Sequence, residues 1–215
     1  MQKPASEYAP DFSPGDWSER DRYFLDAFAI NPGGIVSVLR NLPPEITGAL
    51  CSRASRAAGS LFEVLLKEYI YPIVGGEDRK LAAELEDTVR FLKEHGFKNI
   101  LNNQRAQAFY SKWLSQYGDD SIAQITGAHV VVWGISQVAM KFIEDQRAGL
   151  EPIEKSTRYV NFGTKTGGRY LYYIPKPDLE RFGLLGEYTA TMDHLFDTYV
   201  ALLGPFGSKD DKDIL

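Results

Sequence analysis

Apolar residues recur at helical spacing through the first half of the chain and divide it into segments. The pattern predicts helices at about residues 19–30, 43–71, 78–95 and 101–116. Turn-forming residues separate them: Asn31-Pro32-Gly33-Gly34 follows the first, and Pro72 with Gly75-Gly76 follows the second. The first half of the chain is therefore expected to be helical.

The most apolar segment spans residues 121–147. Ser121 followed by Gln124 fits a capping box at the start of a helix. Small residues recur along the segment, and its centre is apolar on nearly all sides. The pattern predicts that 121–147 is the buried central helix.

The pattern changes after Pro152, where tyrosine, phenylalanine, valine and threonine become frequent. Two such runs, at about 156–163 and 169–174, flank the turn-like sequence TKTGG and predict a β-hairpin. A last helix is expected at about 178–203. This order indicates an α+β fold with helices packed on a small antiparallel sheet.

The domain boundaries follow from the ends of the chain, which lack periodicity. Residues 1–18 are polar and proline-containing and are expected to form a flexible arm. Residues 19–205 are expected to form a single α+β domain, followed by a polar tail at 206–215.

Composition and charge exclude several classes of protein. The 215 residues are 44% hydrophobic and 25% charged, with a net charge of −5, which is typical of a soluble globular protein. A single cysteine, Cys51, excludes an internal disulfide framework. Basic residues are dispersed, which argues against a nucleic-acid partner. No apolar run reaches the roughly 20 residues of a membrane helix and the N-terminus does not resemble a signal peptide, so no membrane partner and a cytoplasmic location are expected.

Common motifs for nucleotides and metals are missing. Neither GxGxxG nor GxxxxGK[ST] occurs, and the three histidines are too far apart for a metal motif, so no metal is expected. The sequence GDDS at 118–121 has two adjacent carboxylates that suit metal binding or acid–base chemistry. Carboxylates at the start of a helix are also favoured by the helix dipole alone, so both interpretations stay open.

Residues 144–162, EDQRAGLEPIEKSTRYVNF, carry the most chemical information. If the chain is extended after Pro152, then Glu154, Ser156 and Arg158 point to the same face. A hydroxyl and a guanidinium side by side suit a phosphate, because the guanidinium donates two parallel hydrogen bonds and the hydroxyl a third. The alternative is a surface strand with a Glu–Arg pair, worth about 0–1 kcal/mol.

EKSTRY resembles the end of the signature of the flavin-dependent thymidylate synthases. That signature is Arg-His-Arg, seven residues, then Ser-x-Arg-Tyr, with a Glu two places before the Ser. Here residues 145–147 read Asp-Gln-Arg, eight residues follow, and 156–159 read Ser-Thr-Arg-Tyr, with Glu154 in place. GDDS at 118–121 is similar to the family's Gly-His-x-Ser/Thr segment, and Ser-Arg-Ala-Ser at 52–55 to its Ala-Arg-x-Ser segment.

The resemblance implies an α+β fold like that of the thymidylate synthase complementing proteins, and a set of ligands. In the family, FAD, methylenetetrahydrofolate and NADPH serve the transfer of a one-carbon unit to dUMP, in a homotetramer. Carried over by position, the implied FAD contacts are Ser55, Ser121, Gln146, Arg147 and Glu154. The implied dUMP contacts are Ser156, Arg158 and Tyr159; the first two hold the phosphate, and catalysis is expected to depend on them.

The sequence departs from the family at several positions. Asp145 replaces the first arginine of the signature, Gln146 replaces its histidine, and Asp119 replaces the histidine of the Gly-His segment. No counterpart is found to a late arginine that helps to bind the nucleotide. Two hypotheses follow: a divergent FAD-dependent thymidylate synthase-like enzyme, or a catalytically silent flavin- or nucleotide-binding module on the same fold, as one half of a tandem protein.

Overall fold

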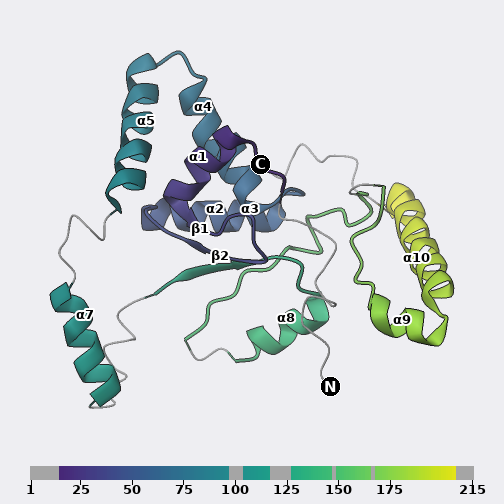
Figure 1. Cartoon of the computed structure of the whole chain (residues 1–215). Coiled ribbons are helices and arrows are strands. Elements are labelled where there is room, and N and C mark those ends of the chain that lie inside the picture. The colour runs from purple at the N-terminus through teal and green to yellow at the C-terminus, as the bar shows by residue number, and fades with distance from the viewer. Residues whose placement is uncertain (1–14, 97–103, 117–126, 147–148, 166–167, 207–215) are drawn as a thin grey trace. The chain divides into compact units, whose positions relative to one another are not determined.

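The computed structural model divides the chain into two compact units. It describes residues 15–96, 104–116, 127–146, 149–165 and 168–206 (Figure 1). The larger unit comprises Ser13–Ser156, and the chain from Thr157 onward belongs to the smaller unit. Each unit is described by itself.

The larger unit contains most of the helices. Two of its helical elements, η2 and η3, are π-helical turns. In chain order the helical elements described are α1 (Glu19–Phe28), α2 (Pro44–Arg56), α3 (Leu61–Val64), η2 (Leu65–Ile70), α4 (Tyr71–Val74), α5 (Arg79–Glu94), α7 (Gln104–Tyr110), η3 (Ser111–Gln116) and α8 (Gln137–Glu144).

Local hydrogen bonds explain where the first helices begin. Ser18 forms a capping box at α1: its Oγ accepts from the amide of Asp21 at 3.1 Å, while the Asp21 carboxylate accepts from the Ser18 amide at 2.9 Å. Asp78 caps α5 by accepting from the amides of Lys80 and Leu81, each at 3.0 Å. The expected helix at 43–71 is interrupted after α2, because Ser60 caps a new helix by accepting from the Glu63 amide at 3.2 Å.

Three short antiparallel strands form the sheet, in the order β1 (Ala29–Ile30), β2 (Val36–Leu39) and β3 (His129–Val132). Val36 pairs with Val132, and Val38 pairs with Val130. Helices cover one face of this sheet, and Leu39 on that face is buried in the core (Figure 1). The result confirms the α+β prediction of helices on a small antiparallel sheet.

The core of the larger unit is built from the helices before β3. Its largest fully buried apolar side chains come from five of these elements and are Phe24, Leu25, Leu50, Phe62, Leu65 and Val89. The single cysteine, Cys51, is half-buried beside this core, and burial raises the pKa of its thiol. The N-terminal helices therefore supply most of the buried side chains in the described part of the larger unit.

The prediction of one buried helix over 121–147 is wrong for the part that the structure describes. Val130–Val132 lie in β3, and β-branched residues favour a strand of this kind. Gly134 then adopts a positive φ of 73°, and Ser136 starts α8 by accepting from the amide of Ala139. All residues of α8 are described, and none of them is buried.

The smaller unit contains α9 (Lys176–Phe182) and α10 (Leu185–Phe206). The pattern predicted one helix over 178–203. Gly183 divides it, because this residue takes a left-handed conformation with φ 68° at the end of α9.

The predicted hairpin at 156–163 and 169–174 is also wrong among the described residues. Thr157–Tyr159 form a turn, and the chain before α9 is mostly irregular. The reason lies in the tyrosines, whose hydroxyls bind elsewhere: Tyr170 donates to Asp197 at 2.6 Å and Tyr172 to Asp193 at 2.9 Å, both on α10. These aromatic residues pack on a helix instead of pairing across two strands.

Candidate functional site

The C-terminal end of α2 contacts the segment that resembles the family signature. The Ser156 amide donates to the Ser55 carbonyl at 2.9 Å. The Lys155 ammonium donates to three further backbone oxygens, those of Ala54 at 2.8 Å, Ala57 at 2.6 Å and Gly59. We call these two segments, residues 52–60 and 154–156, the α2 corner; both belong to the larger unit.

Helix geometry explains why a lysine suits this position. The last turn of a helix leaves carbonyl oxygens without intrahelical donors, and these oxygens carry the negative end of the helix dipole. Beyond Arg56 the chain is extended at Ala57 and then turns into α3, so more carbonyls gather there. An ammonium has three donors and a positive charge, and it meets both needs at once.

Burial affects the charge of Lys155. It lowers the pKa of this ammonium to about 8, from an ordinary 10.5. The Glu63 carboxylate acts in the opposite direction, and the Arg53 guanidinium lowers the pKa further. Sequence analysis did not single out Lys155, because its partners are backbone oxygens about a hundred residues earlier, for which no side-chain motif exists.

The arginines of α2 at this corner bind neighbouring groups. Arg53 contacts Glu68 of η2 through two nitrogens, Nε and Nη2, each 3.0 Å from a carboxylate oxygen. Arg56 donates to the carbonyl and the hydroxyl of Ser52, at 2.9 and 2.7 Å. Two-point contacts of this kind orient a guanidinium. Arg53 therefore ties α2 to η2.

Ser55 lies in the last turn of α2, beside the carbonyl contact to Ser156. Its hydroxyl donates to the Ser52 carbonyl at 2.8 Å. With its proton used in this way, the Ser55 oxygen offers lone pairs to a ligand and acts as an acceptor. This chemistry suits an N–H or O–H group of a ligand better than a phosphate oxygen.

The other predicted cofactor residues are placed as follows. The Glu154 side chain, within the α2 corner, is exposed. Gln146 follows α8, and its side-chain amide donates to the Phe142 carbonyl at 3.3 Å. Ser121 and Arg147 lie outside the described residues. Of the predicted residues, the structure thus brings Ser55 and Ser156 into direct contact.

Arg158 and Tyr159 belong to the smaller unit, while Ser156 belongs to the larger one. Both side chains are exposed, and the Arg158 guanidinium lies 5.7 Å from the centroid of the Tyr159 ring. The turn at Thr157–Tyr159 ends the extended chain that was expected to align Arg158 with Ser156. Covalent geometry still keeps the two Cα atoms within about 7 Å.

Asp145, which stands where the signature has its first arginine, is ion-paired. Its carboxylate lies 3.0 Å from the Lys141 ammonium, one turn earlier on α8. Both side chains are mainly exposed, so this pair contributes about 0–1 kcal/mol. The reversed charge at Asp145 is thus offset within the helix.

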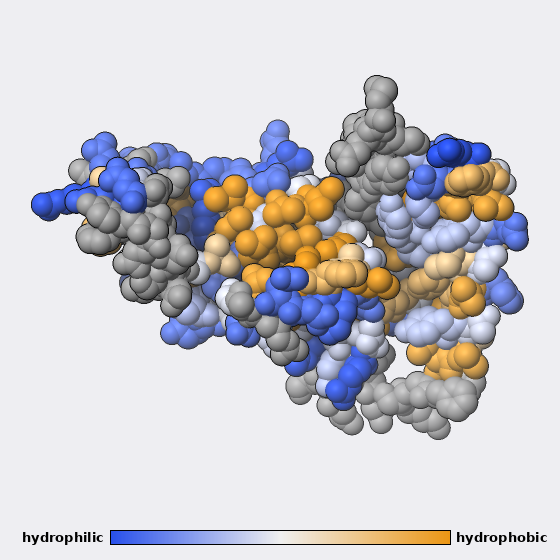
Figure 2. Space-filling view, turned by 90° about the horizontal axis from the view of Figure 1, so that it is seen from below, coloured by the Kyte–Doolittle hydropathy of each residue, from blue (hydrophilic) through white to orange (hydrophobic). Residues whose placement is uncertain are grey.

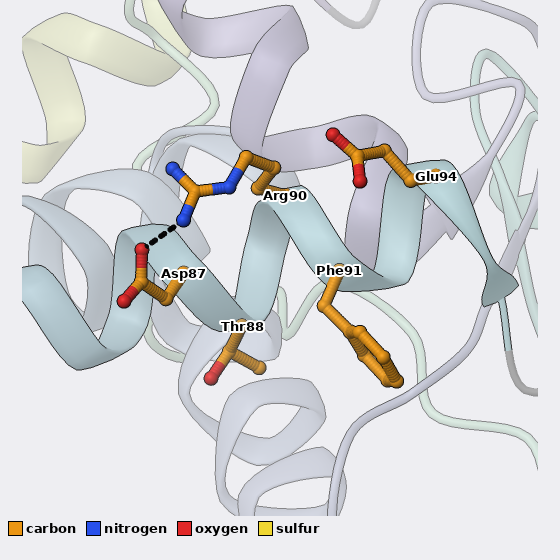
Figure 3. Close-up of a pocket in the computed structure, with 5 residues that line it drawn as sticks. All are labelled: Asp87, Thr88, Arg90, Phe91 and Glu94. Atoms are coloured by element: carbon orange, nitrogen blue, oxygen red, sulfur yellow. Dashed lines mark hydrogen bonds and ion pairs between the residues drawn. The ribbon is translucent and has the colours of Figure 1, made fainter.

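Two other kinds of site find no support in the described part of the chain. No group of three or more His, Cys, Asp or Glu side chains there is arranged to hold a metal ion. A hollow of about 430 Å³ lies along α5, lined by Asp87, Thr88, Arg90, Phe91 and Glu94 (Figure 3). These residues all come from one helix, and a binding pocket needs walls that enclose its ligand.

No described helix is long and apolar enough to cross a membrane.

Lys155 gives a prediction about pH. Because its pKa is about 8 in the folded chain and 10.5 in the unfolded chain, unfolding takes up a proton between these values. The contribution of Lys155 to the free energy of unfolding should therefore increase as the pH rises from about 8 to 10.5. Urea unfolding of the wild type and Lys155→Met across this range measures it. The difference between the two proteins should shift in favour of the wild type, and a constant difference would contradict the lowered pKa.

Comparison with known proteins finds one family model and several relatives similar to this chain. Residues 78–211 match the family described as thymidylate synthase complementing protein. A UPF0159 protein of Chlamydia muridarum is 37% identical over 189 residues, covering 88% of this chain and 33% of the relative. A UPF0159 protein of Chlamydia pneumoniae is 37% identical over 184 residues, with coverages of 86% and 32%. The UPF0159 protein Ta1429 of Thermoplasma acidophilum is 41% identical over 106 residues, covering 47% and 20%.

The chain spans about a third of the length of the two chlamydial relatives. No solved structure matches it. The matched range contains residues 118–121 and 145–159, whereas residues 52–55 precede it. Because the match covers more than half of the sequence, this chain belongs to the thymidylate synthase complementing protein family.

Proposed function

We propose that this chain is a divergent flavin-dependent thymidylate synthase-like protein that binds dUMP. Methylenetetrahydrofolate would donate the one-carbon unit, with FAD as cofactor and NADPH as reductant. The observation that carries the proposal is the hydrogen bond between the Ser156 amide and the Ser55 carbonyl. It joins two segments, each similar to a family motif, that are about a hundred residues apart in sequence.

The phosphate of dUMP is assigned to Ser156 and Arg158. Ser156 is half-buried at the α2 corner, and Arg158 follows two residues later with an exposed guanidinium. A phosphate accepts two parallel hydrogen bonds from a guanidinium and a third from a hydroxyl. Tyr159, whose ring lies beside the Arg158 guanidinium, helps to orient that fork.

The residues of the α2 corner also fit part of a flavin. Ser55 offers an acceptor oxygen and Glu154 an exposed carboxylate, and both can accept from N–H or O–H groups of FAD. When bound, FAD supplies the electron transfer that the side chains of this chain cannot perform. The role of the chain is then to bind and orient both ligands.

A second candidate function is a catalytically silent nucleotide-binding module. The observation that favours it lies on α8, where Asp145 pairs with Lys141 and Gln146 binds the Phe142 carbonyl. Both positions correspond to signature residues that in the family bind FAD. A chain with these substitutions can keep the nucleotide contacts and lose the flavin contacts.

Flavin content and product formation separate the two functions. The enzyme hypothesis predicts that concentrated purified protein is yellow and shows a flavin spectrum. It also predicts that the protein forms dTMP from dUMP when methylenetetrahydrofolate, FAD and NADPH are added. A colourless protein that binds dUMP without forming dTMP would support the silent module instead.

Arg158 provides the sharpest test of the nucleotide site. Arg158→Ala should weaken dUMP binding by about 2–3 kcal/mol, since a charge-assisted fork is lost. Arg158→Lys should recover only part of this, because an ammonium lacks the planar pair of donors. Ser156→Ala should cost about 1 kcal/mol, the worth of one hydrogen bond. Calorimetric titration with dUMP measures all three effects.

Arg181 supplies the matched control for this series. Its guanidinium lies 5.4 Å from the ring of the neighbouring Phe182, in an arrangement like that of Arg158 on Tyr159. Arg181→Ala should leave dUMP affinity unchanged. Equal affinity across the wild type and all variants would overturn the phosphate site.

We also propose that the chain forms a homotetramer, as the family resemblance implies. The sheet of the larger unit exposes an aliphatic face, visible as a continuous apolar area in Figure 2. Four side chains on this face are at least 40% exposed: Ile30, Val36, Val130 and Val132. This surface supports assembly, because an exposed apolar patch marks an interaction site.

Light scattering at micromolar concentration tests the assembly. The wild type should have the mass of a tetramer. Val130→Lys, which places a charge in the middle of the apolar sheet face opposite Val38, should yield a smaller species. A wild type that is only monomeric would contradict shared sites between copies.

A further inference from the structure

We infer that Lys155 is a positioning residue that makes the C-terminal end of α2 compatible with a bound phosphate. The inference rests on the proposed function in one respect, the dUMP phosphate at Ser156. Its structural part rests on hydrogen bonds of the described residues alone.

The end of α2 is an unfavourable electrostatic environment for a phosphate. Anion sites in proteins are commonly built at the N-termini of helices, where N–H groups and a positive partial charge face the ligand. Ser156 lies at the opposite end of a helix, because its amide binds the carbonyl of Ser55 in the last turn of α2. A phosphate bound there would face carbonyl oxygens and the negative end of the helix dipole.

Lys155 removes this conflict. Its ammonium donates to the carbonyls of Ala54, Ala57 and Gly59, so the oxygens that would repel a phosphate are paired with a cation. The neighbouring arginines hold other partners, Glu68 for Arg53 and Ser52 for Arg56. Lys155 is therefore the cation assigned to these three backbone groups.

Lys155 also helps to fix the position of the backbone at Ser156. Lys155 lies between Glu154 and Ser156, and both of its flanking residues are predicted ligand contacts. The ammonium and the Ser156 amide together make four hydrogen bonds to the end of α2 and the turn that follows. Four bonds on two adjacent residues fix the backbone at Ser156. Fixing it reduces the entropy that the segment would lose when a ligand binds.

Three variants test the inference. Lys155→Met keeps a long unbranched side chain without a donor or charge, and Lys155→Arg keeps a cation with donors. Ser18→Ala removes the capping box of α1 and serves as a control for general destabilisation, since it breaks a cap elsewhere in the larger unit. Each is compared with the wild type by amide hydrogen exchange and by titration with dUMP and with deoxyuridine.

The expected results are specific to Lys155→Met. The Ser156 amide should exchange at least tenfold faster than in the wild type. Affinity for dUMP should fall about tenfold, and affinity for deoxyuridine, which lacks the phosphate, should fall much less. Lys155→Arg should keep most of the slow exchange and most of the dUMP affinity of the wild type. Ser18→Ala should reproduce neither change.

Each contrary result identifies what fails. Unchanged exchange at Ser156 in Lys155→Met overturns the anchor. If Lys155→Met loses affinity for dUMP and deoxyuridine equally, the electrostatic role is overturned. If Ser18→Ala loses as much dUMP affinity as Lys155→Met, the effect of Lys155 is one of general stability alone. If the wild type binds no dUMP, the proposed function is overturned. Faster exchange of the Ser156 amide in Lys155→Met would then still show that Lys155 holds this segment in place.

Discussion

The larger unit depends on how the carbonyl oxygens at the end of α2 are satisfied. The chain leaves this helix at Arg56 and starts α3 at Leu61, after only four intervening residues, so backbone oxygens gather in a partly buried turn. Leaving such groups without donors costs about 1–3 kcal/mol each. Lys155 supplies three bonds from a segment about a hundred residues away, and the larger unit ends at the next residue, Ser156.

The same contact bears on the phosphate site that we propose at Ser156. At a helix N-terminus the backbone itself binds the anion. At the end of α2 the backbone offers acceptors, so a phosphate proposed to bind at Ser156 would have to be held by side chains. Under that proposal, Lys155 pairs the carbonyl oxygens that the phosphate would otherwise meet.

Sequence patterns predicted the elements whose causes are local. The helices α1 and α5 begin at side-chain caps, Ser18 and Asp78, and both were predicted within two or three residues. The strand β3 was missed because a continuous apolar run fits a buried helix as well as a strand. Its pairing with Val36 and Val38, nearly a hundred residues earlier, decided the outcome. Tyr170 and Tyr172 read as strand residues, but their partners lie on α10.

The candidate site shows the same division. The contact between Ser55 and Ser156 agrees with the resemblance, which implies FAD contacts both at Ser55 and at Glu154, two residues before Ser156. The role of Lys155 could not be predicted, because its partners are backbone oxygens, which every residue has and no sequence motif identifies.

The signature has one half that departs from the family and one half that keeps its residues, and the two halves are held in the structure by different contacts. The half that departs from the family, at Asp145 and Gln146, sits at the end of the exposed helix α8, where both side chains bind groups of that helix. The half that keeps the family residues begins at Glu154 and is held to the end of α2 and the turn that follows by four hydrogen bonds. Substitutions on an exposed helix change a contact without disturbing the core, whereas changes in the anchored segment would leave buried carbonyls unpaired. This chain can therefore alter its proposed flavin contacts at little cost in stability while it keeps the proposed nucleotide contacts, so the two binding functions can separate in this branch of the family.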